Sequence, residues 1–290
     1  MTKSIVGKQA GAVRSNALTL SIVIPVFNEQ DYLADCLDSI CVQSELPDEV
    51  IVVDNNCTDR SMEIAKKYPF VTIIKEPKQH QAFAQKTGFD YARGDILGRI
   101  DADTILPIDW VKKVKTAFAG QPGIAAITGG PDPYDVSLKR PAVSIFMFYH
   151  SLAGRIAGTQ MIWGANAAIR RSAWLEIKDR VLQRPDIWED YDLALLIGAK
   201  KNIQFVPGID VGSSFRAAHK PFFKQLEYQF RMIRTLYFRT SFVKTSFIAA
   251  CWSTMIVLYP LAALDNPLLR QLKAFKERRR KILESPALVE

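Results

Sequence analysis

The first third of the chain alternates short apolar runs with amphipathic segments. "LTLSIVIPVF", residues 18–27, is a continuous apolar run rich in branched side chains, as is typical of a strand buried on both faces. Further apolar runs lie at residues 48–54, 70–75 and 95–103, and the segments between them have helical spacing. This alternation predicts an α/β fold with a mostly parallel central sheet and helices on both faces.

Two of the intervening segments begin with a residue that can cap a helix. Asn28 follows the first strand and Thr58 opens the segment 58–68, so we expect each side chain to accept from free helical amides. Beyond residue 120 the pattern is less regular. There we expect strands at 123–130 and 202–208. Helices are predicted from a Gly-rich entry within residues 161–177, and again over residues 188–200.

The last part of the chain combines aromatic, basic and apolar segments. Ser246 to Leu264 carries no charge and approaches the roughly 20 apolar residues that span a bilayer. Basic clusters flank it on both sides, and a single span cannot place both clusters in the cytoplasm. A monotopic or re-entrant helix bent at Pro260 satisfies both flanks, and a buried core helix with a solvated basic tail is the alternative.

Composition narrows the class of protein. Lys and Arg total 38 against 30 Asp and Glu, and the net charge of +8 favours anionic partners such as nucleotide phosphates, acidic lipid or nucleic acid. Because the basic residues crowd beside an apolar run, lipid explains them better than nucleic acid. The four cysteines form no zinc-type spacing. No G-x-G-x-x-G follows the first strand, which argues against a dinucleotide oxidoreductase.

Polar clusters stand where three of the predicted strands end. They are Phe27 to Glu29, Asp54, and Asp101 to Asp103. Carboxyl ends of parallel strands meet at one edge, where ligands of such sheets bind. Asp101 and Asp103 can share a face, and paired carboxylates suit Mg²⁺ or Mn²⁺, although one of them can instead serve the turn that precedes Pro107. Asp54 can accept a hydrogen bond from a nucleobase or ribose, or can serve a turn.

A second acidic pair, Glu189 and Asp190, lies in "IWEDYDL". Partial burial beside another acid raises a carboxyl pKa and suits a general base that accepts a proton from a hydroxyl group. Acids in the first turn of a helix also interact favourably with its dipole. The spacing alone leaves both interpretations open.

The chain resembles the family-2-type inverting glycosyltransferases over about residues 18–220. The resemblance lies in five segments, "SIVIPVFNE", "EVIVVDNNCTDRS", "GDILGRIDADT", "WGANAAIRRSAW" and "IWEDYDL". It implies a nucleotide-diphosphosugar-transferase fold of the glycosyltransferase A type, which is Rossmann-like, with an added C-terminal apolar helix. The chain departs from the family where many relatives have Ala-Arg-Asn-x-Gly, because it reads "AQKTG" at residues 84–88.

The resemblance also implies roles for individual residues. Asp190 matches the catalytic base and Glu189 its acceptor-contacting partner, while Asp101 and Asp103 match the metal-binding D-x-D motif. His219 is a third candidate metal ligand by position, with a surface histidine as the alternative. Lys86 or Arg99 can replace the missing cation toward the diphosphate. The other residues expected to bind the nucleotide sugar are Pro25, Phe27, Asn28, Glu29, Asp54, Ala102, Gly164 and Asn166, together with Asp101.

These matches imply a metal-dependent inverting transferase that uses Mn²⁺ or Mg²⁺ and a nucleotide diphosphate sugar, with UDP-sugar favoured. The expected acceptor is a glycan or lipid-linked hydroxyl compound in cell-envelope synthesis, at the cytoplasmic face of the cell membrane. A sugar nucleotidyltransferase and a non-catalytic nucleotide-sugar-binding protein are the alternatives. The predicted organisation is a flexible tail over 1–17, a catalytic domain over 18–240, a membrane-associated apolar helix over 241–266 and a basic tail over 267–290.

Overall fold

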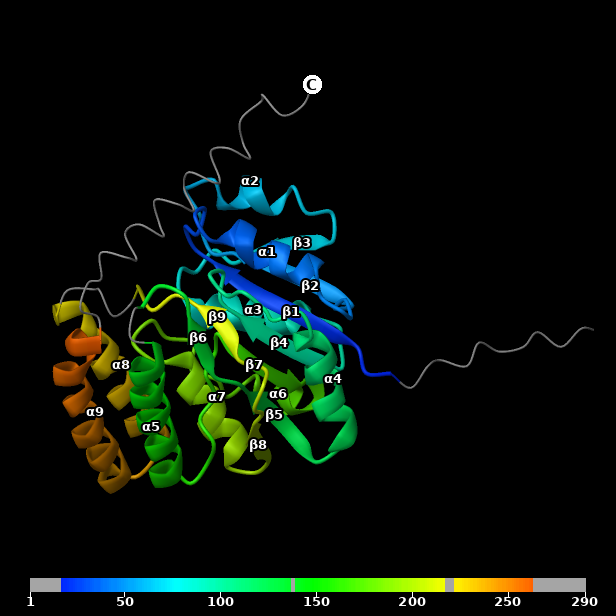
Figure 1. Ribbon diagram of the computed structural model, residues 1–290. Helices are drawn as coiled ribbons and strands as arrows, with labels where there is room; N and C mark the ends of the chain where they lie inside the picture. Colours follow the sequence, from blue (N-terminus) through cyan, green and yellow to red (C-terminus); the bar gives the residue numbers. More distant parts are fainter. Residues whose placement is uncertain (1–16, 137–138, 217–221, 263–290) are drawn as a thin grey trace, which may run out of the picture.

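A computed structural model describes residues 17–136, 139–216 and 222–262 of the chain (Figure 1). Its centre is a seven-stranded sheet of order β3-β2-β1-β4-β7-β5-β8. The strands of this sheet are β1 (Leu20–Val26), β2 (Glu49–Asp54), β3 (Val71–Lys75), β4 (Ile96–Ile100), β5 (Ile124–Thr128), β7 (Asn166–Arg170) and β8 (Asn202–Phe205). A second sheet of two short strands, β6 (Pro131–Pro133) and β9 (Val211–Ser213), lies beside it.

The central sheet is mostly parallel, which confirms the predicted fold class. Only β7 runs antiparallel to its neighbours, β4 and β5. The sequence pattern predicted a helix for this region after a Gly-rich entry, and that prediction is wrong for Asn166–Arg170. The Ala-rich segment Ala167 to Ile169 is buried between two strands, so ladder hydrogen bonds and burial outweigh its local helix preference.

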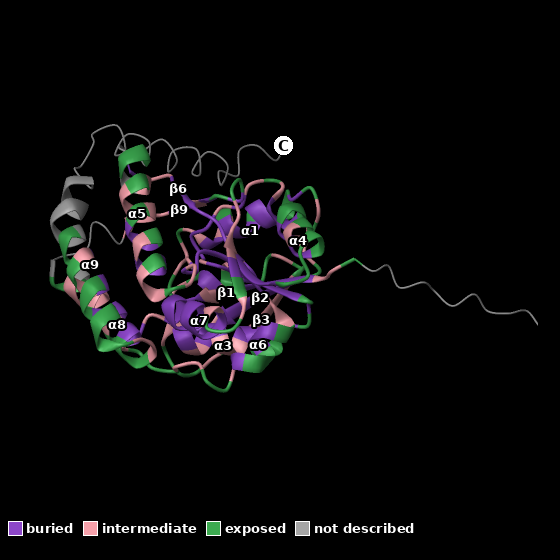
Figure 2. Cartoon of the chain, turned by 90° about the horizontal axis from the view of Figure 1, so that it is seen from below, coloured by how far each residue is buried: buried purple, intermediate pink, exposed green. Residues whose placement is uncertain are grey.

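Alternate residues of the strands build two separate cores on the two faces of the sheet. Ile22 and Ile24 of β1 pack into one core, and Val23 packs into the other. Successive side chains of a strand point to opposite faces, so a strand covered on both sides is apolar throughout. Figure 2 shows the buried strands of the sheet in purple. The apolar run at residues 18–27 is therefore continuous because its strand is buried on both faces, as the sequence pattern indicated.

Helices cover both faces of the sheet (Figures 1 and 2). Residues of α1, α2 and α4 join one core, and residues of α3, α6 and α7 join the other. The helices are α1 (Leu33–Cys41), α2 (Ser61–Ala65), α3 (Gln81–Tyr91), α4 (Trp110–Gly120), α5 (Lys139–Ala157), α6 (Arg171–Ile177), α7 (Glu189–Gly198), α8 (Phe222–Arg239) and α9 (Phe242–Ala262).

The two predicted helix caps are wrong, because Asn28 and Thr58 bond to each other's segment instead. The Asn28 side chain accepts from the Thr58 amide at 2.8 Å and donates to its hydroxyl group at 3.2 Å. Helix α1 begins only at Leu33 and α2 only at Ser61, and at the start of α2 the Asp59 side chain accepts from the Ser61 amide at 2.9 Å. Asn28 has a positive φ of 55°, which an Asn side chain tolerates better than most. This cross-link fixes the loops that follow β1 and β2 against each other.

Three helices lie together beside the sheet: α5, α8 and α9 (Figure 1). Met232, Leu236, Ile248 and Trp252 are buried and join the same core as α7. Within the described ranges, none of the helices is both long enough and apolar enough to cross a membrane. The outer surface of α8 and α9 nevertheless keeps large apolar side chains exposed, among them Phe223, Phe230, Tyr237, Phe242 and Phe247.

Several predicted features lie outside the described residues. They are most of the tail over 1–17, the basic tail over 267–290, the end of the apolar run and His219. The predicted domain limits therefore remain predictions.

Candidate active site

A cavity of about 710 Å³ opens at the carboxyl ends of β1, β2 and β4. Side chains that follow these strands form one end of it, and the start of α7 with helices α5, α8 and α9 forms the other. The sheet edge predicted to bind ligand is thus the edge that carries the cavity. Among the residues expected there, those that line it are Pro25, Phe27, Glu29, Arg99, Asp101, Ala102, Asp103, Glu189 and Asp190.

The first acidic pair lies directly after β4. The Asp101 carboxylate accepts from the Gln81 side chain at 3.0 Å and pairs with Arg99 at 2.9 Å. Asp103 is buried, and its carboxylate lies 3.2 Å from the Arg216 guanidinium. Burial raises the pKa of Asp103 to about 7, the nearby charge of Asp101 adds to this, and Arg216 opposes it. Two carboxylates held this close therefore favour a bound cation.

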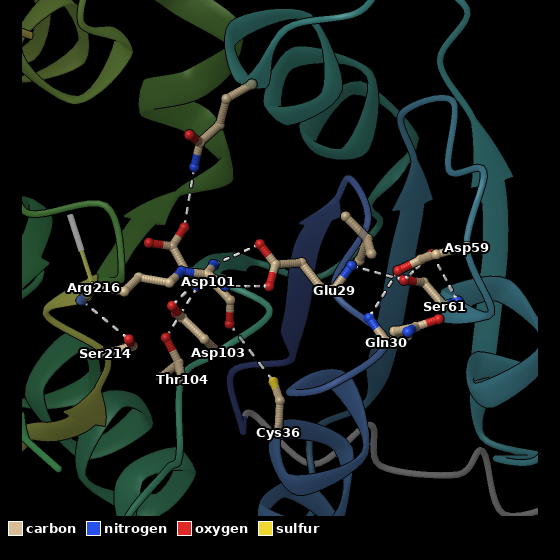
Figure 3. Close-up of polar contacts among 12 residues, drawn as sticks. Glu29, Gln30, Cys36, Asp59, Ser61, Asp101, Asp103, Thr104, Ser214 and Arg216 are labelled. Atoms are coloured by element: carbon tan, nitrogen blue, oxygen red, sulfur yellow. Dashed lines mark hydrogen bonds and ion pairs between the residues drawn. The ribbon is translucent and has the colours of Figure 1, made fainter. Parts of the chain in front are cut away.

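Arg216 is a site residue that the sequence reasoning missed. It follows β9 and donates to both oxygens of Glu29, at 2.8 and 2.5 Å, while it also pairs with Asp103 (Figure 3). Its guanidinium lies 4.7 Å from the centre of the Tyr32 ring. No motif surrounds Arg216 in the sequence, and its partners are far away along the chain, so no local signal pointed to it.

The second acidic pair begins helix α7 and lines the same cavity as Asp103. Glu189 and Asp190 are both buried in its first turn, where the helix dipole favours negative charge. The Gly164 amide donates to the Asp190 carboxylate at 2.9 Å. A side chain at Gly164 would overlap both this carboxylate and the Arg99 guanidinium, so the close approach of these groups requires glycine.

Arg99 forms ion pairs with carboxylates of both acidic pairs. Its guanidinium is buried and lies 2.9 Å from Asp101 and 3.5 Å from both Glu189 and Asp190. The sequence reasoning offered Arg99 as a cation for the donor diphosphate; the structure pairs it with these three acids, and its buried Nε has no hydrogen-bond partner among the described residues. Burial alone would lower the Arg99 pKa, but the charges of Asp101, Asp190 and Glu189 outweigh burial and raise it.

Burial also shifts the second acidic pair toward the protonated form. It raises the pKa of Glu189 to about 8, with a further contribution from Asp190 and opposition from Arg99. Burial raises the Asp190 pKa as well, again against the lowering effect of Arg99. A buried carboxyl group with a raised pKa has the properties of a general base. The arrangement can therefore accept a proton from a hydroxyl group that enters the cavity.

Two predicted residues lie away from the cavity. Lys86 pairs with Asp90 within α3, and its amine lies 6.0 Å from the centre of the Trp174 ring. Asn166 is fully buried in β7, where its side chain donates to the carbonyl of Ile209 and accepts from the Trp110 indole. The side-chain amide of Asn166 therefore links the loop before β9 and helix α4 to the central sheet. The structure brings neither residue to the acids.

Asp54 and Asn28 lie at strand ends near the cavity, in turn-forming roles. The Asp54 carboxylate accepts from the Cys57 amide at 2.9 Å and fixes the loop after β2. Asn55, which follows it, lines the cavity and accepts from the His80 amide at 2.9 Å. The loops after β1, β2 and β3 are thus cross-linked into one rim.

The acids at the end of β4 fit a divalent cation of the Mg²⁺ or Mn²⁺ type. Such ions take carboxylate oxygens, and Mg²⁺ is commonly held by one or two carboxylates together with substrate phosphates. Asp101 and Asp103 supply two carboxylates, and burial, followed by the charge of Asp101, raises the pKa of Asp103; a cation would offset both effects. Among the described residues, no group of three or more His, Cys, Asp or Glu side chains is placed to hold a metal by itself.

The fold resembles those of two solved proteins that carry nucleotide sugars. The fold resembles that of the mannosyltransferase PcManGT from Pyrobaculum calidifontis, solved in complex with GDP-Man and Mn²⁺. The TM-score is 0.61 at 18% identity, over 91% of this chain and 81% of that one. The fold also resembles that of Staphylococcus aureus TarS in complex with UDP-GlcNAc. There the TM-score is 0.53 at 16% identity, over 68% of this chain and 58% of that one.

The chain belongs to glycosyl transferase family 2. The sequence model of that family matches residues 21–177, which is more than half of the 290 residues. The match confirms the family resemblance seen in the sequence and the glycosyltransferase class, while inversion and metal dependence stay predictions.

Individual relatives match over shorter segments. YibD of Escherichia coli, an uncharacterized glycosyltransferase, is 32% identical over 29% of this chain and 26% of its own length. AglE of Haloferax volcanii is 31% identical over 35% of this chain and 36% of itself. The undecaprenyl-phosphate 4-deoxy-4-formamido-L-arabinose transferase of Pseudomonas fluorescens is 31% identical over 42% of this chain and 38% of itself. The matches thus span between a quarter and two fifths of these relatives.

Proposed function

We propose that the protein is an inverting, metal-dependent glycosyltransferase. Its donor is a nucleotide diphosphate sugar, with UDP-sugar favoured, and its acceptor is a hydroxyl or lipid-linked compound in cell-envelope glycan or glycolipid synthesis. Two fold neighbours, solved with GDP-Man and with UDP-GlcNAc, support the donor class. A relative named as an undecaprenyl-phosphate transferase supports a lipid-linked acceptor.

One observation carries this proposal: both acidic pairs line the same cavity, and the buried guanidinium of Arg99 contacts a carboxylate of each pair. Arg99 contacts Asp101 on the strand side and Asp190 on the helix side. This places a carboxylate pair suited to a donor diphosphate and its cation near a base suited to an acceptor. Glycosyl transfer depends on positioning of the reactants and on charge stabilisation of the leaving group. Holding the carboxylate pair and the base in fixed positions relative to each other therefore favours the reaction.

The proposed reaction is a single displacement. The acceptor oxygen bonds to the anomeric carbon of the donor as its proton passes to the Asp190 carboxylate. The bond from the anomeric carbon to the diphosphate oxygen breaks, and the nucleoside diphosphate leaves with the electron pair. Asp101 and Asp103 would hold a divalent cation, which when bound supplies positive charge to the leaving diphosphate. Attack from the face opposite the leaving group inverts the anomeric carbon.

The test is release of nucleoside diphosphate from a panel of nucleotide sugars, with lipid extract as acceptor, in Mn²⁺, in Mg²⁺ and in chelator. We expect release from one donor, loss of release in chelator, and loss in Asp190→Asn with donor binding retained. Product stereochemistry by NMR then reports inversion or retention. Pyrophosphate release would instead favour a nucleotidyltransferase, and tight donor binding without turnover would favour a non-catalytic binding protein.

We further propose that the enzyme works at the cytoplasmic face of the cell membrane, through the outer side of α8 and the start of α9. Phe223, Phe230 and Tyr237 recur every seventh residue, so they share one face of α8, and their exposed fractions are 81%, 64% and 64%. Exposed Lys224 and Arg234 lie on the same helix. Aromatic side chains interleaved with cations suit an interface with anionic lipid.

Vesicle flotation tests this location. The full chain is expected to float with vesicles that contain anionic phospholipid and to remain below with neutral ones. The double variant Phe223→Ser, Phe230→Ser is expected to weaken flotation at least tenfold. The matched control is serine at Leu175, an exposed apolar residue of α6. Equal flotation of both variants would contradict the proposed face.

A further inference from the structure

The cavity has a second, aromatic end with chemistry unlike that of its acidic end. Six of its lining side chains, here called the aromatic subsite, come from α5, α7, α9 and the segments before β7 and α7: Phe146, His150, Trp163, Trp188, Tyr191 and Trp252. The rings form one connected cluster. Trp188 stacks on Tyr191 with centres 5.1 Å apart and meets Trp252 edge-on at 6.0 Å, while Phe146 meets Trp163 at 5.8 Å.

The aromatic subsite adjoins the proposed base. Tyr191 follows Asp190 in α7, Trp188 precedes the acidic pair, and all of them line the same cavity. Phe146, Trp163 and Trp188 are only half-buried, so part of each ring surface is left for a ligand. A compound that places an oxygen atom at Asp190 therefore lies against aromatic rings. By position, this end of the cavity receives the acceptor.

Within the described residues, three buried polar atoms of this subsite lack a hydrogen-bond partner. His150 Nε2, the Tyr191 hydroxyl group and Trp252 Nε1 are buried and have no hydrogen-bond partner within the described part of the chain. These side chains are at least nine-tenths buried. An unpaired polar group in such surroundings destabilises the free protein, so a ligand that supplies partners gains binding energy from them. A purely hydrocarbon chain offers no partner to these atoms, whereas a ring that carries hydroxyl groups offers donors and acceptors to the side chains that bear them.

The charges around the cavity disfavour a phosphate at the base. The cations among its described lining residues are Arg99, Arg216 and Arg231, and each is already paired with carboxylates. A phosphate monoester carries a charge of about −1.5 to −2 at neutral pH and would approach the carboxylates of Glu189 and Asp190. Such a phosphate is largely deprotonated already, because its second pKa is about 6, and it would have little use for a base. A neutral hydroxyl group has a proton to give up.

We propose that the aromatic subsite binds a neutral sugar ring, so that the acceptor is a glycan hydroxyl group and not the phosphate of an isoprenoid phosphate. This inference rests on the proposed transferase function and specifies its acceptor. One face of a sugar ring carries C–H groups that stack on an aromatic ring, and its hydroxyl groups supply partners to His150, Tyr191 and Trp252. The ring hydroxyl group nearest Asp190 gives its proton to that carboxylate as its oxygen bonds to the donor sugar. A lipid attached to this glycan extends away from the base.

Acceptor competition tests the proposal. Wild-type protein is given its donor and Mn²⁺ with a panel of neutral octyl glycosides of common hexoses and N-acetylhexosamines, or with farnesyl phosphate. We expect transfer to at least one glycoside and none to the phosphate. Transfer to farnesyl phosphate, or failure of every glycoside both to bind in calorimetry and to react, would overturn the proposal. Metal-dependent donor binding is measured separately, because its absence would refute the transferase function itself.

Two variants report on the subsite. Tyr191→Phe and Trp252→Phe each remove one unpartnered polar atom and keep a ring. We expect each to raise the KM for the glycoside about tenfold, which corresponds to about 1.4 kcal/mol, and to leave donor KM unchanged. Tyr237→Phe, at an exposed position of α8, is the matched control. A glycoside KM equal to that of the control in both variants would show that these atoms do not bind the acceptor.

Discussion

The Arg216 guanidinium lies 3.2 Å from the Asp103 carboxylate, in the region where a cation for the donor diphosphate is expected. The same guanidinium forms a two-point pair with Glu29 and covers the Tyr32 ring. Paired in this way, Arg216 offsets the acidic end of the cavity, and it competes with any metal ion for Asp103.

Arg216→Ala is therefore expected to bind Mn²⁺ more tightly than wild type when no nucleotide is present. The side chain is 40% exposed, so a pair of this kind contributes about 1 kcal/mol and the gain in affinity is about fivefold. Electron paramagnetic resonance of free Mn²⁺ measures it directly. Arg60→Ala, which removes an exposed cation paired with Glu63, is the control. Unchanged or weaker Mn²⁺ binding in Arg216→Ala would refute the competition.

Replacing Arg99 is expected to destabilise the protein severely. Arg99→Met leaves Asp101, Glu189 and Asp190 near one another with no buried cation between them. Removing one partner of a buried ion pair costs about 3–5 kcal/mol, and we expect a loss of this size in the free energy of unfolding by urea. Arg99→Lys keeps the charge and should lose less. Equal stability of Met and Lys variants would mean that charge at this position is unimportant.

Gly164→Ala is expected to reduce activity more than stability. The added methyl group would overlap the Asp190 carboxylate and the Arg99 guanidinium, so the proposed base must move. A shift of about 1 Å in a reacting group can lower the rate about 100-fold, and kcat/KM should fall by that order. Gly123→Ala serves as the control, because a methyl group there meets no atom within 4 Å. Comparable kcat/KM values in the two variants would show that the close approach at Gly164 does not affect the reaction.

His150 is expected to make the fold sensitive to acid. Burial lowers its pKa to about 4, partly offset by a hydrogen bond to the Met161 backbone. Since the unfolded value is about 6.5, its contribution is complete above that pH and is lost as pH falls toward 4, by about 2 kcal/mol between pH 7 and 5. Urea unfolding at both pH values measures this loss. His150→Phe should remove that part of the pH dependence, and an unaltered dependence would assign it to other groups.

Local patterns predicted much of the sheet because burial on two faces leaves a signal within a few residues. The runs at 18–27 and 48–54 became β1 and β2 within two residues, and the acids at the end of β4 lie at the expected edge. The helix starts were wrong at Asn28 and Thr58, where a side chain found a partner in a distant loop in place of its own helix. The strand Asn166–Arg170 was missed because its alanines carry no strand preference of their own.

By itself, the sequence determined the fold class, the family and the two acidic pairs, because periodicity, motif order and residue chemistry are all written locally. Only the tertiary structure decided which groups meet. It paired Arg99 with both Asp101 and Asp190, and it brought Arg216 into contact with Glu29, which lies 187 residues away along the chain. It placed Lys86 and Asn166 away from the cavity. It also gathered aromatic rings from separate helices beside the proposed base. Such contacts depend on how distant elements pack, and no short stretch of sequence records that packing.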